Sequence, residues 1–239
     1  MNVGRLVKKC RAGYQLLRGR GRPSFSQAGE DILVAYLLAE LRIDNVSYLD
    51  IGTNHPVLGN NTFYFYNRGG RGVCVEANKS ICRKIRRARP RDTVINAGVS
   101  AKSGSADLFV FPDPYSGWNS FSEKEAIAKQ QETGISWKAV IQVPLVSINQ
   151  VLDRHFPHPP HFISLDVEGL DLEILKSLDF EKFKPEVICV ETVNFSKDHK
   201  EVKNASIIEW VSNQGYFLYA DTHINSIFCR TAAYKMLET

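Results

Sequence analysis

The chain has 239 residues, of which 44% are hydrophobic and 23% are charged. These values are typical of one soluble globular domain with a sizeable core. No apolar run approaches the roughly 20 residues that cross a bilayer, and the start of the chain lacks the features of a secretory signal. Five cysteines without CxxC spacing indicate buried thiols in a reducing compartment. Composition therefore argues against a helical membrane protein and a disulfide scaffold, and we expect a cytoplasmic location.

The net charge of +4 is concentrated at the start of the chain. Seven lysines and arginines precede the first acidic residue, Glu30, and without them the net charge is −3. Residues 1–23 are therefore predicted to form a basic, loosely amphipathic N-terminal extension. Such a segment either contacts the inner face of an anionic membrane through residues 3–22 or serves as a solvated or docking arm. This concentration of charge argues against a nucleic-acid-binding face spread over the fold.

Helical and strand-like patterns alternate after the extension. Ser26 is expected to cap a helix whose apolar positions run from Ile32 to Leu41. Five β-type runs follow, VSYLDIG, RGVCVEA, DTVINAGVS, HFISLDVEG and PEVICVET, with helical stretches at 80–88, 147–156, 170–178 and 206–214. The late runs GYFLYAD and NSIFCRT are predicted to form an antiparallel edge.

This alternation predicts an α/β fold. We expect a Rossmann-like, doubly wound, mostly parallel seven-stranded sheet with an antiparallel C-terminal strand, formed by residues 24–239. The segment 112–137 is polar and aromatic, with PDPYSGWNSF followed by a helix-like SEKEAIAKQQ. A connection of this length inside a compact domain is usually an active-site lid or a binding loop, so we expect a lid or acceptor loop here.

Acidic residues end several of the predicted strands. They are Asp50, Glu76, Asp166 with Glu168, and Glu191. Ligands of open α/β sheets bind beyond the carboxyl ends of the strands, so a binding site is expected at that edge. Gly52 permits close approach of a backbone to a ligand, and Glu76 can accept hydrogen bonds from both hydroxyls of a ribose. Because the sequence has no GxGxxG array, the pattern indicates a nucleoside-containing cofactor other than a dinucleotide.

The ordered set of motifs resembles the FkbM-type S-adenosylmethionine-dependent methyltransferases, which have the class I methyltransferase fold. The motifs are FSQAGED, YLDIG, NNTFYFY, CVEAN, INAGVS and SLDVEGLDLEIL, and the resemblance covers about residues 24–230. One position departs from the pattern, since many members carry a further glycine where this chain has His55-Pro56. That variant occurs in a branch with the same SQ-GED opening.

The resemblance implies O-methyl transfer from S-adenosyl-L-methionine, often to a sugar hydroxyl in polysaccharide or natural-product assembly. A small-molecule or glycan acceptor is therefore the expected partner. Carried over residue by residue, the family pattern assigns Asp50, Gly52 and Asn54 to the amino-acid part of the cofactor, Glu76 to the ribose, Asn96 and Ala97 to the adenine, and Asp166 to the sulfonium and the acceptor.

Catalysis requires a group that removes a proton, because a sugar hydroxyl is a poor acid. Asp166 and Glu168 are two residues apart on an extended strand end and project to the same side. They can act as a base or as hard oxygen ligands of Mg²⁺, although Glu168 can instead cap the helix predicted near Leu170. His223, in the late DTH sequence, is another candidate base.

Two other functions stay open. A non-catalytic Rossmann-like module can keep a cofactor pocket without the base, and the missing glycine after Asn54 is compatible with that alternative. An RNA or protein methyltransferase recruited by the basic extension is the other. The arginine-rich run at 83–91 has no interleaved aromatic residues, which favours a solvated helix face over nucleic-acid binding, so no nucleic-acid partner is expected.

Overall fold

The structure, a computed structural model, describes residues 21–167, 169–194 and 202–236. Most of the predicted N-terminal extension, Cys10 and Glu168 therefore lie outside the described residues. Cys74, Cys82, Cys189 and Cys229 are free thiols and all four are buried, as expected. Among the described residues, no helix combines the length and apolar character needed to cross a membrane.

Seven strands form the main sheet, in the order β11-β12-β8-β7-β1-β2-β3. Their bounds are β1 Ser47–Ile51, β2 Arg71–Glu76, β3 Thr93–Asn96, β7 Phe162–Leu165, β8 Val187–Glu191, β11 Tyr216–Asp221 and β12 Asn225–Arg230. The pairs from β8 to β3 are parallel, and β12 is antiparallel to both β8 and β11. The predicted fold class is confirmed, with β12 as the antiparallel C-terminal strand.

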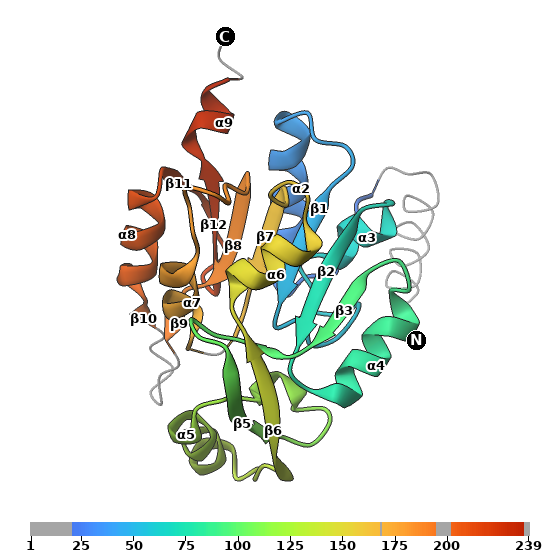
Figure 1. The fold of residues 1–239 in the computed structure, drawn as a ribbon, viewed down its shortest axis with the longest axis vertical. Coiled ribbons are helices and arrows are strands. Elements are labelled where there is room, and N and C mark those ends of the chain that lie inside the picture. The colour runs from blue at the N-terminus through green and yellow to red at the C-terminus, as the bar shows by residue number, and fades with distance from the viewer. Residues whose placement is uncertain (1–20, 168, 195–201, 237–239) are drawn as a thin grey trace, which may run out of the picture.

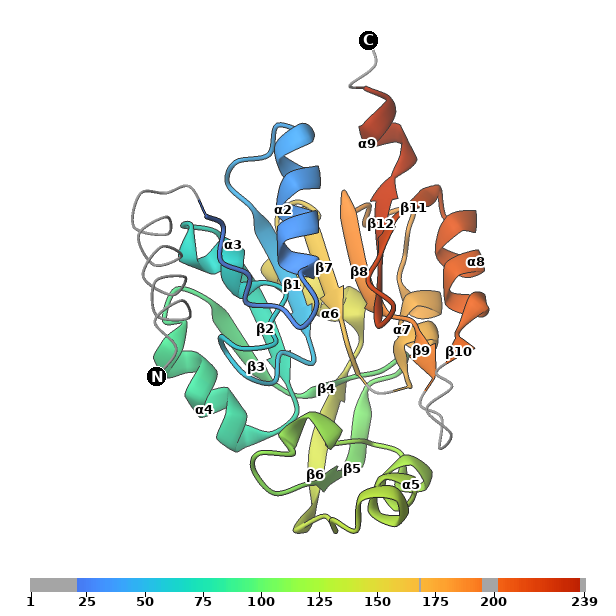
Figure 2. The ribbon, with the colours of Figure 1, turned by 180° about the vertical axis from the view of Figure 1, so that it is seen from behind.

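Helices cover both faces of this sheet (Figures 1 and 2). One face is packed by α6 (Ile148–His155), α7 (Asp171–Ser177) and α8 (Ala205–Asn213), and the other by α2 (Glu30–Glu40), α3 (Phe63–Asn67) and α4 (Lys79–Ala88). A short α9 (Thr231–Lys235) follows β12. Apolar strand residues alternate between the two cores, as the period of two along a buried strand requires.

A second, smaller sheet was not predicted from the sequence. It has the order β4-β6-β5, formed by β4 (Gly98–Val99), β5 (Gly104–Val110) and β6 (Ala139–Val146). Between β5 and β6 the chain forms a 3-10 helix, Ser116–Trp118, and helix α5, Glu123–Thr133. We call residues 104–146 the lobe; it lies below the main sheet in Figure 1.

The third predicted β-type run is divided between the two sheets. Its first part is β3 and its second part is β4, with Ala97 between them. A further two-stranded sheet pairs β9 (Val193–Asn194) with β10 (Val202–Lys203).

The predicted helix at the start of the domain begins later than its sequence pattern indicates. Gly29, not Ser26, occupies the N-cap position of α2 and has a φ of 95°. The Ser26 hydroxyl still accepts hydrogen bonds from the N–H groups of Gly29 and Asp31. Ser26 therefore stabilises the turn before the helix, because glycine supplies the left-handed backbone that α2 requires at its start.

A fully buried arginine, Arg89, connects the β1–β2 side of the sheet to α4. Its Nε donates to Asp92 Oδ2 at 2.8 Å, and its terminal nitrogens donate to Asp50 Oδ2 at 3.5 Å, Asn60 Oδ1 at 3.1 Å and Thr62 Oγ1 at 2.8 Å. The side chains of Arg89 and Asp92 are 0% exposed. Four protein oxygens therefore replace the water molecules that would solvate the guanidinium. A charged group can be buried only when it is paired and hydrogen-bonded in this way.

The sequence interpretation of 83–91 as a solvated helix face is wrong for Arg89. Residue 89 follows the last turn of α4 and faces the sheet, while Arg83, Arg86 and Arg87 are exposed. The two carboxylates that neutralise Arg89 explain why this member of the run is buried and the others are not.

We predict that Arg89→Ala lowers the free energy of unfolding by about 3–5 kcal/mol, because it leaves two carboxylates buried without their counter-ion. Arg87→Ala, on the exposed side of the same helix, is the matched control and is expected to change stability by less than about 0.5 kcal/mol. Urea unfolding followed by circular dichroism measures both variants. Equal destabilisation by the two substitutions would contradict a stabilising role of the buried pair.

Candidate functional site

A cavity of about 750 Å³ opens at the carboxyl edge of the main sheet. Its lining comes from the residues that follow β1, β2, β3, β7 and β8, from the lobe, and from Gln27, Leu58, Gly59 and Ile224. A volume of this size is sufficient for a ligand of several hundred daltons. The site thus occupies the edge that the sequence predicted.

Strand register explains which of the predicted residues reach the cavity. Ile51 pairs with Val75 in β2 and with Leu165 in β7, and Leu165 pairs with Val190 in β8. The residues that follow these positions, Gly52, Glu76, Asp166 and Glu191, therefore stand at one level of the sheet edge, and all four line the cavity.

Asp50 lies on the inner side of that level and does not line the described cavity. Its carboxylate accepts hydrogen bonds from Thr62 Oγ1 at 2.6 Å and Asn60 Nδ2 at 3.1 Å and pairs with Arg89. Burial raises the pKa of Asp50, and the guanidinium of Arg89 partly offsets that effect. The structure thus shows Asp50 holding the β1 loop, and its expected contact with the cofactor stays a prediction.

Glu76 is buried at the end of β2 and its carboxylate is oriented by backbone donors. Oε1 accepts the N–H of Asn78 at 2.7 Å, and Oε2 accepts the N–H of Asn54 at 3.0 Å. Burial raises the pKa of Glu76, while these two hydrogen bonds favour its ionised form. Since a carboxylate has about four acceptor positions, each oxygen retains capacity for a ligand hydroxyl.

Gly52 lies where the β1 and β7 loops touch. Its φ is 78°, and a Cβ atom at this position would come within 1.8 Å of the backbone oxygen of Asp166. The sequence attributed this glycine to close approach of a ligand, whereas the structure shows close approach of the neighbouring strand end. Gly52 also lines the cavity, so the two roles are compatible.

Asp166 lines the cavity and is exposed to it. Desolvation by the surrounding protein, together with the negative charges of Asp50 and Glu30, raises the pKa of Asp166 to about 6. Asp171, at the first position of α7, accepts the N–H of Val167 at 3.2 Å. Burial and the charge of Asp166 raise the pKa of Asp171 to about 7. Clusters of carboxyl groups with raised pKa values are characteristic of functional sites.

The part of the cavity beside Glu76 is apolar. It is lined by Val75, Ala77, Ala97, Val99, Leu108 and Phe121. Asn96 does not line the cavity, because its side-chain amide donates to the backbone oxygens of Glu76 and Ala77. Asn96 thus holds the ends of β2 and β3 together, and Ala97 is the residue of this pair that faces the cavity.

His223, the other described residue predicted as a catalytic base, does not line the cavity. His223 is exposed, has a φ of 75°, and donates its backbone N–H to Asp221 Oδ1. Glu168 is not described. Among the described residues, no group of three or more His, Cys, Asp or Glu side chains is arranged to hold a metal ion, so the Mg²⁺ site at Asp166 and Glu168 stays a prediction.

Gln27 lines the cavity but was not predicted as a site residue. It belongs to the FSQAGED motif, which therefore offered a signal. Four residues of α5 also line the cavity: Lys124, Glu125, Ala128 and Lys129. They lie within the segment 112–137 that was predicted as a lid or acceptor loop, although no individual residue of this helix was named.

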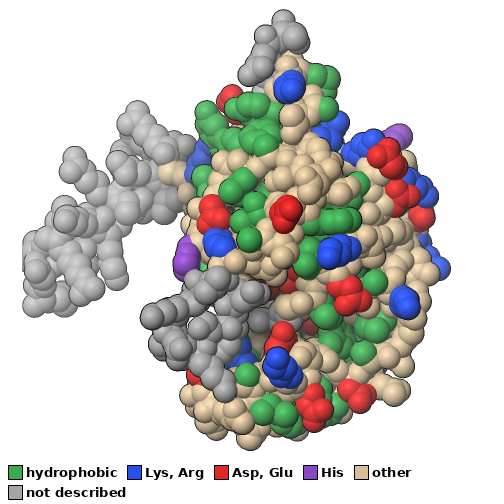
Figure 3. Space-filling model, turned by 90° about the vertical axis from the view of Figure 1, so that its left-hand side faces the viewer, with side chains coloured by type: hydrophobic (Ala, Val, Ile, Leu, Met, Phe, Trp, Pro, Cys, Tyr) green, Lys and Arg blue, Asp and Glu red, His purple; other side chains and the backbone are tan. Residues whose placement is uncertain are grey.

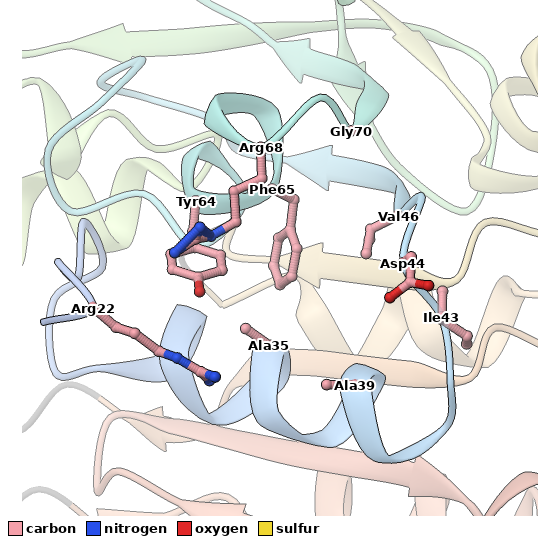
Figure 4. A pocket seen from close by; sticks show the side chains of 10 residues that line it. All are labelled: Arg22, Ala35, Ala39, Ile43, Asp44, Val46, Tyr64, Phe65, Arg68 and Gly70. Carbon is pink, nitrogen blue, oxygen red and sulfur yellow. The ribbon is translucent and has the colours of Figure 1, made fainter. Parts of the chain in front are cut away.

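A smaller cavity of about 280 Å³ lies between α2 and α3 and contains none of the predicted site residues. Figure 4 shows its apolar floor, with Arg22 and Arg68 toward one end and Asp44 at the other. On the face turned to the viewer in Figure 3, Lys and Arg are interspersed with Asp and Glu among the coloured residues, without a large patch of one sign. The 750 Å³ cavity, with its clustered carboxylates, is therefore the candidate functional site.

The strand order and the cavity at the carboxyl edge define a Rossmann-like fold of the class I methyltransferase type. The family model described as methyltransferase FkbM domain matches residues 50–218. The chain therefore belongs to the FkbM methyltransferase family, which confirms the resemblance found in the sequence motifs.

Comparison with solved structures gives similar folds at low sequence identity. A TehB-like S-adenosylmethionine-dependent methyltransferase from Corynebacterium glutamicum is 8% identical, with a TM-score of 0.46 over 93% of this chain and 97% of that chain. An O-methyltransferase from Bacillus cereus, in complex with S-adenosylhomocysteine, is 12% identical, with a TM-score of 0.42 over 90% and 86%. No curated protein sequence matches the chain.

Two glycines of the cavity test the contact between the β1 and β7 loops. Gly52→Ala should destabilise the protein by considerably more than Gly59→Ala, because both have positive φ but only position 52 meets a backbone atom. The left-handed conformation alone costs a residue with a Cβ about 1–2 kcal/mol, which is the expected loss at position 59. Thermal unfolding measures the difference, and similar losses at both positions would be inconsistent with the contact.

Proposed function

We propose that the protein is an S-adenosyl-L-methionine-dependent O-methyltransferase that acts on a hydroxyl of a sugar or of a glycan or natural-product intermediate. Membership of the FkbM family supports methyl transfer. The observation that carries the choice of donor is the single cavity that combines the carboxylate of Glu76, an apolar wall and the carboxyl of Asp166.

The residues of this cavity fit the chemical groups of the donor. Glu76 has acceptor capacity for the two ribose hydroxyls, and the wall that includes Ala97, Val99 and Leu108 is suited to the adenine. Asp166, with its negative charge when ionised, is suited to a cationic neighbour. S-adenosylmethionine supplies an electrophilic methyl group on a positively charged sulfur.

The second half of the cavity is suited to a hydroxylated acceptor. Asp166 and Glu191 offer carboxylate oxygens, Gln27 offers an amide, and Leu58 and Ile224 add apolar surface. A pKa near 6 leaves Asp166 largely ionised at neutral pH, as a general base requires. We assign to Asp166 the acceptance of the hydroxyl proton, a contribution of about 10²–10⁴-fold for a well-positioned base.

Holding donor and acceptor in line is the other contribution of the site. Alignment of two reactants in one cavity lowers a barrier by about 7–11 kcal/mol in favourable cases. The lobe covers part of the cavity through Trp118, Phe121 and α5, and exclusion of water by such a cover strengthens electrostatic interactions inside. The proposed mechanism takes no step through Mg²⁺ or His223.

Two observations favour this function over its alternatives. A non-catalytic module has no need for a carboxyl group with a pKa near 6 at the donor cavity, which Asp166 provides. For an RNA methyltransferase, a positive cavity rim is expected. Within the described part of the chain, the charged residues of the lining are instead four acids and two lysines: Glu76, Glu125, Asp166, Glu191, Lys124 and Lys129.

Calorimetric titration tests the donor site directly. The protein should bind S-adenosylmethionine with micromolar affinity and should not bind NAD⁺. Glu76→Ala should weaken donor binding at least about 10-fold, because two hydrogen bonds to a charged group contribute roughly 1.5–3 kcal/mol each. Glu173→Ala, an exposed acid on α7, is the control. Absence of donor binding to the unsubstituted protein would refute the proposed function.

The pH dependence of donor binding tests the position of Asp166. Burial raises the Asp166 pKa to about 6, so the carboxyl is neutral well below pH 6 and negative well above it. A nearby cation lowers the pKa of an aspartate by about one unit or more. The affinity for S-adenosylmethionine, relative to that for S-adenosylhomocysteine, whose sulfur carries no charge, should therefore rise about 5-fold or more between pH 5 and pH 7.5.

The matched variant is Asp166→Asn, which keeps the shape of the side chain but has no titrating carboxyl. Calorimetry of both ligands across this pH range should give a constant affinity ratio for Asp166→Asn. An identical rise in the ratio for the variant and the unsubstituted protein would exclude Asp166 as the group beside the sulfonium.

A further inference from the structure

The lobe contacts the β1 loop through Ser116. This residue lies in the 3-10 helix Ser116–Trp118, and its hydroxyl donates to Asn54 Oδ1 at 3.1 Å. The next residue, Gly117, is so close that a Cβ atom there would lie 3.4 Å from Asn54 Nδ2. A segment 62 residues away in the sequence thus contacts the side chain of Asn54.

Asn54 is also bound to the other side of the cavity. Its backbone N–H donates to Glu76 Oε2 at 3.0 Å, and its φ is 48°. Asparagine adopts this left-handed conformation more readily than most residues with a Cβ. The three residues therefore form a continuous hydrogen-bonded chain, from the carboxylate of Glu76 through Asn54 to Ser116 of the lobe.

The turn that carries Ser116 is held together by aromatic contacts. The ring of Tyr115 stacks on Trp118 with centroids 4.6 Å apart, and Phe111 meets Trp118 edge-on at 6.0 Å. Asn119 Oδ1 accepts the N–H of Phe111 at 2.8 Å. Because its residues are linked to one another in this way, the turn is expected to move as one body.

A second contact joins the lobe to the β7 loop independently of Glu76. Ser120 Oγ donates to Glu125 Oε2 at 2.6 Å, and the carboxylate of Glu125 lies against Gly169, where a Cβ atom would be 2.3 Å from Oε1. The lobe thus has two contacts at the cavity. Ser116 is connected to Glu76 through Asn54, and Glu125 lies against the loop that follows Asp166.

We propose that Ser116 is a positioning residue that couples occupation of the Glu76 site to closure of the lobe over the acceptor half of the cavity. The inference rests on the proposed function, because the ligand at Glu76 is S-adenosylmethionine. Ribose hydroxyls bound to Glu76 fix the carboxylate that orients Asn54, and Asn54 in turn holds Ser116. Because the donor stabilises the arrangement in which Lys124 and Lys129 of the lobe line the cavity, donor binding precedes acceptor binding.

Tryptophan fluorescence measures this coupling. The chain has three tryptophans, and Trp137→Phe with Trp210→Phe leaves Trp118, two residues from Ser116, as the reporter. In this background, S-adenosylmethionine should change the Trp118 emission. Ser116→Ala should remove most of that change and weaken donor binding about 3- to 10-fold, as expected for the loss of one hydrogen bond.

The control variants separate a positioning role from a general loss of structure. Ser116→Thr keeps a hydroxyl and should restore the fluorescence response. Ser105→Ala, at an exposed position on β5 of the same lobe, should behave as the background protein does. Asn54→Gly removes the other partner at a backbone conformation that glycine adopts freely. It should cause at least the loss seen with Ser116→Ala, because Asn54 itself also lines the cavity.

The double variant Ser116→Ala with Asn54→Gly should bind the donor no more weakly than the weaker-binding single variant, because both remove the same hydrogen bond. Additive losses would overturn the inference, as would an unchanged fluorescence response in Ser116→Ala. In both of these cases calorimetry on the background protein still detects donor binding, so the proposed function stands. Absence of donor binding to the background protein itself would overturn both the proposed function and the coupling.

Discussion

The geometry of the donor side depends on one buried charge. Arg89 donates to Asp50, Asp92, Asn60 and Thr62, and thereby connects β1, the loop that follows it, and the end of α4. The same loop begins with Gly52 and Asn54 at the cavity. A buried cation is stable only with its hydrogen-bond partners in place. The loop after β1 is therefore held in the one conformation that keeps Asn60 and Thr62 bound to Arg89.

The cavity itself results from a shared level of strand ends. Parallel strands in register place the residue after each strand at the same edge, which is why Glu76, Asp166 and Glu191 meet although they are far apart in the sequence. Desolvation by the surrounding protein is the larger cause of the raised pKa of Asp166, and the negative charges of Asp50 and Glu30 add to it. Removal of a carboxyl group from water and nearby like charges both disfavour its ionised form.

Sequence analysis identified the main sheet, its antiparallel strand and the edge that forms the site, because hydrophobic period and strand-end acids are local signals. The assignment of Asp50 to the cofactor stays a prediction, and local patterns did not reveal the ion pair of Asp50 with Arg89. The register that sets Asp50 deeper in the sheet than Glu76 depends on pairing between distant strands. Arg89 was missed for the same reason, because its counter-ion Asp50 lies 39 residues away.

The second sheet was the other feature that local patterns did not reveal. β5 and β6 are paired along seven residues each, with Pro144 within β6, and a proline weakens the prediction of a strand. The segment between them was predicted as a lid or acceptor loop with a helix-like stretch. The strands that carry this segment follow only from the pairing of β6 with β4 and β5, a tertiary feature.

The lobe is one uninterrupted stretch of chain, whereas the facing wall of the cavity comes from the ends of several strands, with the β1 and β7 loops in close contact at Gly52 and the β1 loop held by Arg89. This division has an evolutionary consequence. Substitutions and length changes between β5 and β6 can alter what enters the cavity without disturbing the sheet, while the strand ends tolerate little variation. A family with this architecture can diversify its acceptors by exchanging one segment, and grafting that segment between members is a practical route to new specificities.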